Sequence, residues 1–217
     1  MSRGESKGER TRAVILGEAL ALTSTDGLAG LTIGSLAERT GMSKSGLFAH
    51  FGSKEQLQQA VLEEAVEMFT LRVIRPATAQ PRGLPRIKAL CENWVAWLRD
   101  SPLPGGCPML SASLELDDKP GPLRDYIAAS QEKLRAFVSE CARRAVIEGH
   151  FREDLDPDQF AFEMLGVGFA HSLTRRLLGH PEADRWACTA VSGLIGRSLA
   201  PGRTVESISN ACAHQTH

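Results

Sequence analysis

Apolar residues recur every three or four positions along almost the whole chain, and this spacing limits the fold more than any other feature. The clearest run consists of Leu57, Ala60, Val61, Ala65, Met68 and Leu71. Such a run places one apolar stripe along one face of a helix. Residues that cap helices bracket the runs: Thr32 and Ser43 precede two of them, and Gly41 ends one. Because alternating strand patterns are missing from the sequence, we predict an all-α fold of about nine helices.

Proline and glycine concentrate in one segment, RPATAQPRGLP at residues 75–85, which is typical of a connection between two parts of a chain. A length of 217 residues suits one domain or two small ones. We interpret this segment as a hinge between two halves. Residues 201–217, which follow the last predicted helix, are expected to form a disordered tail.

Composition constrains the partners and the compartment. The formal net charge is -1, so any DNA binding must come from a local arrangement of charge. No stretch approaches the roughly 20 apolar residues of a membrane span, and the N-terminal segment MSRGESKGERTR lacks the apolar run of a secretory signal. The 5 cysteines contain no Cys-x-x-Cys pair, which favours reduced thiols over a disulfide framework or a zinc site. We therefore expect a cytoplasmic protein with no membrane partner, metal or cofactor.

A short segment between two stronger helices, GMSKSGLFAHFGSKEQL at residues 41–57, carries small and cationic residues at its leading end. Three predicted helices, with a turn at Gly41 before the third, describe a helix-turn-helix within a small bundle. A recognition helix brings its N-terminal residues against DNA, where bulky side chains would hold the two backbones apart. Leu47 and Phe51 lie four residues apart and are expected to anchor the helix, whereas Phe48 and His50 project toward a groove or its phosphates.

The candidate DNA-binding residues are hydroxyl groups, cations, one glycine and two rings: Thr32, Ser43, Lys44, Ser45, Gly46, Phe48, His50 and Lys54. Hydroxyl groups suit phosphates or base edges. Lys44 adds a cation where the helix N-terminus already favours phosphate. Two alternatives remain: His50 packs as a structural residue beside Phe51, and residues 1–10 form either an arm along DNA or a plain disordered terminus.

The segment resembles the DNA-binding region of the tetracycline-repressor (TetR) family of transcriptional regulators. The resemblance covers Thr11 to roughly Leu62. The matching positions are Thr32-Ile33, Leu36-Ala37, Gly41-Met42-Ser43, Leu47, Phe51 and Ser53-Lys54-Glu55. Phe48 stands where many members have a tyrosine and cannot donate to phosphate, whereas His50 offers an imidazole N–H. The resemblance implies a helix-turn-helix domain over residues 1–55, with an arm at 1–10, that binds a palindromic operator in double-stranded DNA.

In the resembling family the second part of the chain dimerises and binds a small effector that controls DNA affinity, so the resemblance assigns both roles to residues 56–200. Small residues that permit close approach of helices in a homodimer are Gly166, Ala170, Ala187, Ala190, Gly193 and Gly196. The alternative is tight packing within one subunit. Residues expected to line a pocket for a small hydrophobic effector are Trp94, Trp97, Met109, Leu110, Phe137, Cys141, Phe162, Phe169 and His171. The alternative assigns part of this set to the core.

A catalytic function finds no support, because the sequence contains no nucleophile elbow, P-loop, His-Glu-x-x-His or paired-carboxylate pattern. We expect a regulator rather than an enzyme, and in the simplest case a repressor that its effector releases from DNA. A second interpretation is a thiol-based, redox-responsive transcriptional regulator. It depends on Cys107, which lies at an expected helix start, where thiols become more reactive.

Overall fold

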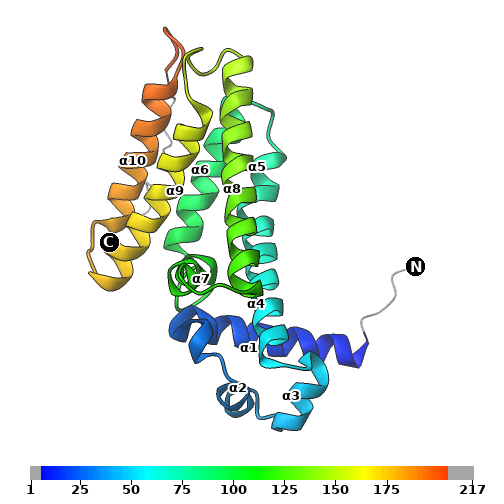
Figure 1. Cartoon of the computed structure of the whole chain (residues 1–217). Coiled ribbons are helices and arrows are strands. Elements are labelled where there is room, and N and C mark those ends of the chain that lie inside the picture. The colour runs from blue at the N-terminus through cyan, green and yellow to red at the C-terminus, as the bar shows by residue number, and fades with distance from the viewer. Residues whose placement is uncertain (1–5, 205–217) are drawn as a thin grey trace. The chain divides into compact units, whose positions relative to one another are not determined.

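The computed structural model describes residues 6–204 (Figure 1). The first elements are α1 (Lys7–Gly30), α2 (Ile33–Thr40), α3 (Lys44–Phe51), α4 (Lys54–Phe69), η1 (Thr70–Ile74) and α5 (Arg75–Thr78). The later elements are α6 (Leu84–Arg99), α7 (Pro108–Leu116), α8 (Pro122–Ile147), α9 (Pro157–Ser172), η2 (Leu173–Leu177) and α10 (Ala183–Ser198). The π-helical turns η1 and η2 continue the helices before them, so residues 6–204 form 9 helical segments. The all-α prediction is confirmed.

Capping side chains set the helix boundaries where the sequence predicts them. The Thr32 hydroxyl accepts a hydrogen bond from the Ser35 amide at 3.0 Å and begins α2. Gly41, with φ 67° and ψ 14°, ends that helix in the left-handed conformation that glycine adopts readily. The Ser43 hydroxyl accepts from the Gly46 amide at 3.1 Å and begins α3. The turn between the two helices is therefore specified by local chemistry at both ends.

The chain divides into two compact units, and the division differs from the predicted one. The first unit comprises the residues up to Met68 together with Pro102–Ala129, and the second comprises Phe69–Ser101 and the residues from Ser130 onward. The predicted boundary at residue 55 lies within α4, and the predicted hinge at 75–85 begins inside α5. Helical structure continues through Pro76, which follows the π-helical turn η1 directly. In that turn the Arg75 amide donates to the Thr70 carbonyl five residues earlier, and such a change of hydrogen-bond pattern is one way in which a helix accommodates a proline.

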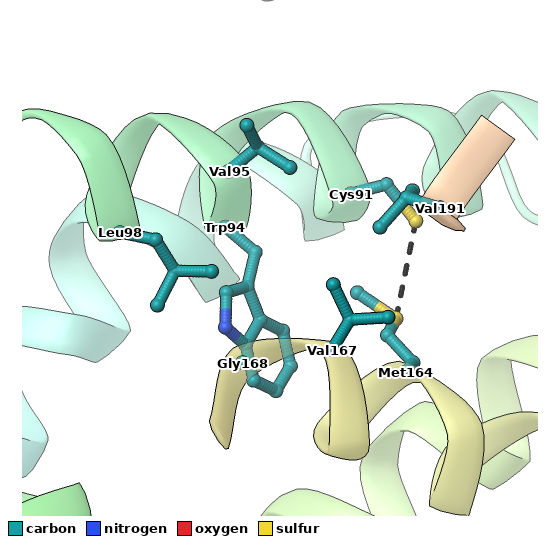
Figure 2. Close-up of a pocket in the computed structure, with 8 residues that line it drawn as sticks. All are labelled: Cys91, Trp94, Val95, Leu98, Met164, Val167, Gly168 and Val191. Carbon is teal, nitrogen blue, oxygen red and sulfur yellow. Dashed lines mark hydrogen bonds between the residues drawn. The ribbon is translucent and has the colours of Figure 1, made fainter. Parts of the chain in front are cut away.

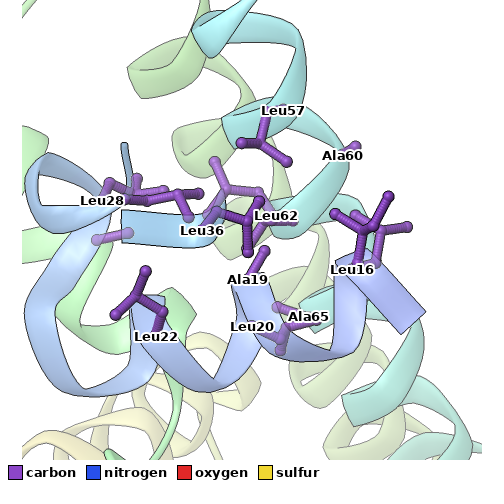
Figure 3. Close-up of a cluster of buried hydrophobic side chains, with 14 of the residues drawn as sticks. Leu16, Ala19, Leu20, Leu22, Leu28, Leu36, Leu57, Ala60, Leu62 and Ala65 are labelled. Atoms are coloured by element: carbon purple, nitrogen blue, oxygen red, sulfur yellow. The ribbon is translucent and has the colours of Figure 1, made fainter. Parts of the chain in front are cut away.

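The core of the first unit joins α1, α2 and α4. Leu20, Leu36, Leu57 and Leu62 are fully buried and lie close together in Figure 3. Side chains from the segment 102–129, including Met109, belong to the same cluster. Burial of such apolar side chains provides most of the free energy that holds short helices in place.

The second unit has its own aromatic core. The rings of Trp94 and Trp97 on α6 meet the ring of Phe69 edge to face, with centroids 5.4 and 5.8 Å apart. Phe151 and Phe160, whose centroids are 5.5 Å apart, are fully buried. Helices α9 and α10 pack against each other, and α6 contacts both. None of the helices in residues 6–204 has the length and apolar character that crossing a membrane requires.

Candidate functional site

Helix α3 presents two different faces. Leu47 and Phe51 are buried in the core of the first unit, as their spacing predicts. On the other side Lys44, Ser45 and Phe48 are exposed, and 46% of the Phe48 side chain is accessible. Burial of this face packs the helix against α2 and leaves its N-terminal end at the surface of the unit.

The leading end of α3 is held by its own side chains. The Ser43 oxygen, besides capping the Gly46 amide, lies 3.1 Å from the Ser45 hydroxyl oxygen. A Cβ at Gly46 would lie 3.2 Å from that Ser43 oxygen and 3.6 Å from the Met42 methyl group. The sequence predicted a small residue here for close approach to DNA. The structure gives it a local reason, because a larger side chain would press on the cap.

Other predicted residues surround this end at different depths. Thr32 at the start of α2 and Lys54 in the first turn of α4 are exposed. His50 is half-buried, with its ring centroid 6.4 Å from that of Phe51. The guanidinium carbon of Arg12 on α1 lies 5.1 Å from the centroid of the Phe51 ring, a cation–π contact that adds positive charge beside α3.

The predicted N-terminal arm is helical where the structure describes it. Residues 1–5 lie outside the described residues, and α1 begins at Lys7. The Ser6 hydroxyl accepts from the Glu9 amide at 3.2 Å, and the Glu9 carboxylate accepts from the Ser6 amide at 2.6 Å. This capping box makes Lys7 and Arg10 part of a regular helix. Residues 205–217, most of the predicted tail, also lie outside the described residues.

An apolar cavity of about 10 Å³ lies in the second unit between α6, α9 and α10 (Figure 2). It is lined by Cys91, Trp94, Val95, Leu98, Met164, Val167, Gly168 and Val191. The Trp94 indole crosses from α6 to α9 and lies against Gly168, where an added Cβ would be 3.4 Å from its Nε1. The Cys91 sulfur lies 3.9 Å from that of Met164. A space of this volume holds about one water molecule.

The lining differs from the predicted pocket. Of the nine predicted residues only Trp94 lines this cavity. Phe162 is a wrong prediction, since 69% of its side chain is exposed. Met109 packs in the core of the first unit, and the Trp97 ring packs on Phe69. Among the rest, Cys141 is buried, whereas Leu110, Phe137 and Phe169 are half-buried. The missed residues Cys91 and Leu98 lie three and four residues from Trp94, on the same face of α6, so the spacing itself carried a signal for them. Val95, the next residue after Trp94, had no such signal.

The remaining predicted pocket residue, His171, belongs to a polar cluster. Its Nε2 lies 2.7 Å from Oδ1 of Asp184, and the other oxygen of Asp184 accepts from Arg175. Burial would raise the pKa of the Asp184 carboxyl, but the hydrogen bonds from His171 and Arg175 outweigh it and hold the pKa below its ordinary value. This cluster ties α9 and η2 to the first turn of α10.

An exposed face with small and large apolar residues runs along α9, η2 and α10. Gly166, Ala170, Ala190, Gly193 and Gly196 are exposed, as a subunit interface requires. Among the large side chains Leu177 is 75% exposed and Trp186 is 45% exposed. Ala187 is a wrong prediction, because it is buried within the subunit, as the alternative of internal packing required. Ala187 lies one helical turn after the buried Ala183 and faces the subunit interior with it, whereas Ala190 and Gly193 face outward.

The cysteines fall into distinct environments. Cys91, Cys107 and Cys141 carry reduced thiols. Burial raises the pKa of the Cys91 thiol far above its ordinary value and that of Cys141 to about 11. Cys107, at the N-cap of α7, is half-buried. Of these three, Cys107 is therefore the thiol that reagents reach most readily.

Both the N-terminal and the C-terminal parts of the chain match known protein families. Residues 15–61 match the family described as bacterial regulatory proteins, tetR family, and residues 83–191 match the tetracyclin repressor-like C-terminal domain. The nucleoid occlusion factor SlmA of Vibrio campbellii is 26% identical over 147 residues, which are 67% of this chain and 74% of that protein.

Solved structures show the same architecture. A TetR transcriptional regulator from Chloroflexus aurantiacus is 27% identical, with a TM-score of 0.81 over 89% of this chain and 98% of that one. AibR, solved in complex with isovaleryl coenzyme A and operator DNA, is 23% identical, with a TM-score of 0.67 over 88% of this chain and 98% of that one. At this identity the likeness to AibR is one of fold.

Proposed function

Because this chain belongs to the tetracycline-repressor family of DNA-binding transcription regulators, we propose that it is a dimeric repressor that a small apolar effector releases from its operator. The exposed leading end of α3, anchored by the buried Leu47 and Phe51, carries this proposal. Members of the family are regulators rather than enzymes. The proposal has three parts, which are the DNA surface, the subunit interface and the effector cavity.

The DNA surface comprises Lys44, Ser45, Phe48, His50 and Lys54. Lys44 and Lys54 are exposed cations beside the N-termini of α3 and α4, where the helix dipoles also favour phosphate. Ser45 is the exposed hydroxyl of the first turn of α3 and is suited to a base edge. Phe48 provides apolar contact, for example with a thymine methyl group. The lysines supply affinity for any duplex, and Ser45 and Phe48 supply the preference between sequences.

Selection of bound duplexes from a random pool tests this part. We expect a palindrome with half-sites about one helical turn, ~34 Å, apart. Lys44→Ala should weaken binding to all duplexes and reduce the salt slope by about one, whereas Ser45→Ala should change the base preference. Lys133→Ala, on an exposed part of α8 in the second unit, is the control for loss of one cation. Equal affinity of the wild type for the selected and random duplexes would refute the proposal.

The subunit interface comprises the exposed residues of α9, η2 and α10. Gly166, Gly193 and Gly196 leave open space beside the helices. A Cβ added at Gly166 or Gly196 meets nothing beyond its own helix within 4 Å, and one at Gly193 meets an Arg197 guanidinium nitrogen at 3.9 Å. Large apolar side chains on the same elements, Phe162, Leu177 and Trp186, are exposed in the single subunit. Small residues allow helices of two subunits to approach, and the large ones lose water when they meet. These features support a homodimer with twofold symmetry.

The effector cavity lies between α6, α9 and α10 and is too small for a ligand as it stands. Ligand pockets commonly enclose about 300–1,000 Å³, compared with about 10 Å³ here. An effector must therefore move the Trp94 indole away from Gly168 and separate the helices. Since Cys91, Met164, Val167 and the other lining residues are apolar, the ligand should be mainly apolar. Separation of α9 from α10 would also alter the helices proposed to pair the subunits, and so the spacing of the two α3 helices.

Fluorescence of Trp94 alone, in a Trp97→Phe/Trp186→Phe variant, provides the test with a panel of apolar compounds. A compound that changes this fluorescence should release the operator, and the operator should weaken the compound by the same factor. Gly168→Ala, which places a methyl group against the Trp94 indole, should weaken both effects while DNA binding persists. Gly17→Ala, on an exposed part of α1, is the control. Compounds that bind at Trp94 without changing operator affinity would refute the coupling.

The thiol-based alternative retains one supporting observation, the half-buried position of Cys107 at the start of α7. In that case an oxidant rather than an apolar ligand would release the operator. Cys107→Ser would then abolish the response to peroxide, whereas it should leave the response to an apolar effector intact. Testing the Cys107→Ser variant with peroxide and with an apolar compound therefore distinguishes the two mechanisms.

A further inference from the structure

The junction between α1 and α2 contains backbone N–H groups that the helices themselves leave without acceptors. Helix α1 is interrupted at Gly27, whose φ of 73° and ψ of 177° are not helical. Leu28, Ala29 and Gly30 then form a new helical turn. The first amides of a helix have no carbonyl one turn earlier to bond to, so the amides of Leu28 and Ala29 require acceptors from elsewhere.

Both acceptors come from one carboxylate on α7. Oε2 of Glu115 accepts from the Leu28 amide at 2.8 Å, and Oε1 accepts from the Ala29 amide at 2.7 Å. Glu115 is half-buried in the last turn of α7. A Cβ at Gly27 would lie 2.7 Å from this carboxylate. Glycine at that position therefore provides both the backbone angle and the space that the carboxylate occupies.

The same junction is held at two other points within the first unit. The Gly105 amide donates to the Ser24 hydroxyl at 2.9 Å, and the Gln58 side chain of α4 donates to the Leu28 carbonyl at 2.7 Å. The residues that follow are fixed in turn: Leu31 is fully buried, and Thr32 caps α2. The orientation of α2, and of α3 one turn later, thus depends on where α7 holds the junction.

We propose that Glu115 is a positioning residue for DNA reading, which sets the orientation of α2 and α3 through the amides of Leu28 and Ala29. This inference depends on the proposed function of α3. Hydrogen bonds between a carboxylate and amides weaken steeply with distance and angle. A displacement of α7 would therefore loosen the junction, which gives the segment 102–129 a route to the DNA surface that is separate from α4.

Two substitutions and one control test the contact. Glu115→Gln keeps the shape but leaves one amide facing an NH₂ group, and Glu115→Ala removes both acceptors. Asp118→Asn, an exposed acid just after α7, controls for the loss of one negative charge. Hydrogen exchange of the Leu28 and Ala29 amides should accelerate in the order wild type, Gln, Ala, and remain unchanged in the control.

Operator binding then tests positioning. Affinity for the selected operator should fall roughly threefold to thirtyfold, less in Glu115→Gln than in Glu115→Ala. The variants should also discriminate less between operators whose half-sites are spaced differently. The slope of affinity against salt should stay the same, because the phosphate contacts remain. A variant that was only less stable would keep its spacing preference at temperatures where it is folded, which thermal unfolding establishes.

Three outcomes overturn different statements. Faster exchange at Leu28 and Ala29 with unchanged operator affinity and spacing preference would overturn the role of Glu115, while DNA reading by α3 would stand. Failure of the wild type to select any sequence from the pool would overturn the proposed function, whatever the exchange rates show. Unchanged exchange in both Glu115 variants would overturn the contact itself.

Discussion

The amide nitrogen of Gly105 lies 2.9 Å from the hydroxyl oxygen of Ser24, across a sequence separation of 81 residues. The two backbones approach so closely that a Cβ on Gly105 would lie 1.5 Å from the Ser24 carbonyl oxygen. Only glycine allows this approach. The contact joins the loop before α7 to the last turns of α1 and makes both parts of one compact unit.

Replacement of Gly105 by alanine should lower the free energy of unfolding by about 3 kcal/mol, because the obstructing atoms are backbone and cannot rotate away. Gly17→Ala is the matched control, since a Cβ there meets nothing within 4 Å. In the interior of α1 this substitution should raise stability by about 0.5–1 kcal/mol. Urea unfolding of both variants measures the difference. Equal effects would show that the close approach is absent in solution.

Alkylation of the native protein at pH 8 should leave Cys91 and Cys141 unmodified. Burial raises the pKa of both thiols, that of Cys141 to about 11. The reactive thiolate is therefore nearly absent from both residues at pH 8, and that of Cys141 becomes populated only as the pH approaches 11. Of the three thiols Cys91, Cys107 and Cys141, the half-buried Cys107 should react first. Mass spectrometry of peptides after a short reaction distinguishes the sites, with urea-unfolded protein as the reference for full labelling.

The polar cluster around Asp184 predicts a dependence of stability on pH. Asp184→Asn should lower the free energy of unfolding by about 1 kcal/mol at pH 7, because His171 and Arg175 lose a charged acceptor. Arg99 also contributes its charge nearby. Since the folded pKa of Asp184 lies below its ordinary value of 3.8, the stabilisation is complete above that pH and is lost as the pH falls through the folded value. The difference between wild type and variant should narrow toward pH 3, and a constant difference would contradict this assignment.

Gly193→Leu should weaken the homodimer without unfolding the subunit. Within the subunit the nearest atom to an added Cβ is an Arg197 guanidinium nitrogen at 3.9 Å, so the leucine has room. Across the proposed interface it would separate the paired helices, and the dimer dissociation constant should rise roughly tenfold or more, about 1.4 kcal/mol. Sedimentation gives the constant, and thermal unfolding of Gly17→Leu is the control. An unchanged dimer would exclude this face of α10.

Local chemistry explains what the sequence predicts correctly. Thr32, Ser43 and Gly41 specify helix ends through contacts within four residues, and the three-four spacing of Leu47 and Phe51 specifies a buried face. The boundary of the units was not predictable in this way. A segment rich in proline and glycine marks a flexible connection only on average. Here the helix continues through Pro76, which directly follows the π-helical turn η1.

The candidate sites that depend on distant contacts were harder to predict. Apolar residues lie on several sides of α9, so periodicity does not distinguish the exposed Phe162 from the buried Phe160. Small residues in α10 likewise face either the subunit interior, as Ala187 does, or its surface. The bonds from Leu28 and Ala29 to Glu115 have no local signal at all, because 87 and 86 residues separate the partners.

The first unit is built from two separate stretches of the chain, so the ribosome synthesises its two parts at different times. Its core needs α7 and the first turns of α8, which follow Met68 only after the whole segment Phe69–Ser101 of the other unit. The ribosome adds about 5–20 residues per second, so the N-terminal helices wait several seconds for Met109 and Ile127 to complete their core. During that interval part of the apolar surface of α4 remains exposed on the nascent chain.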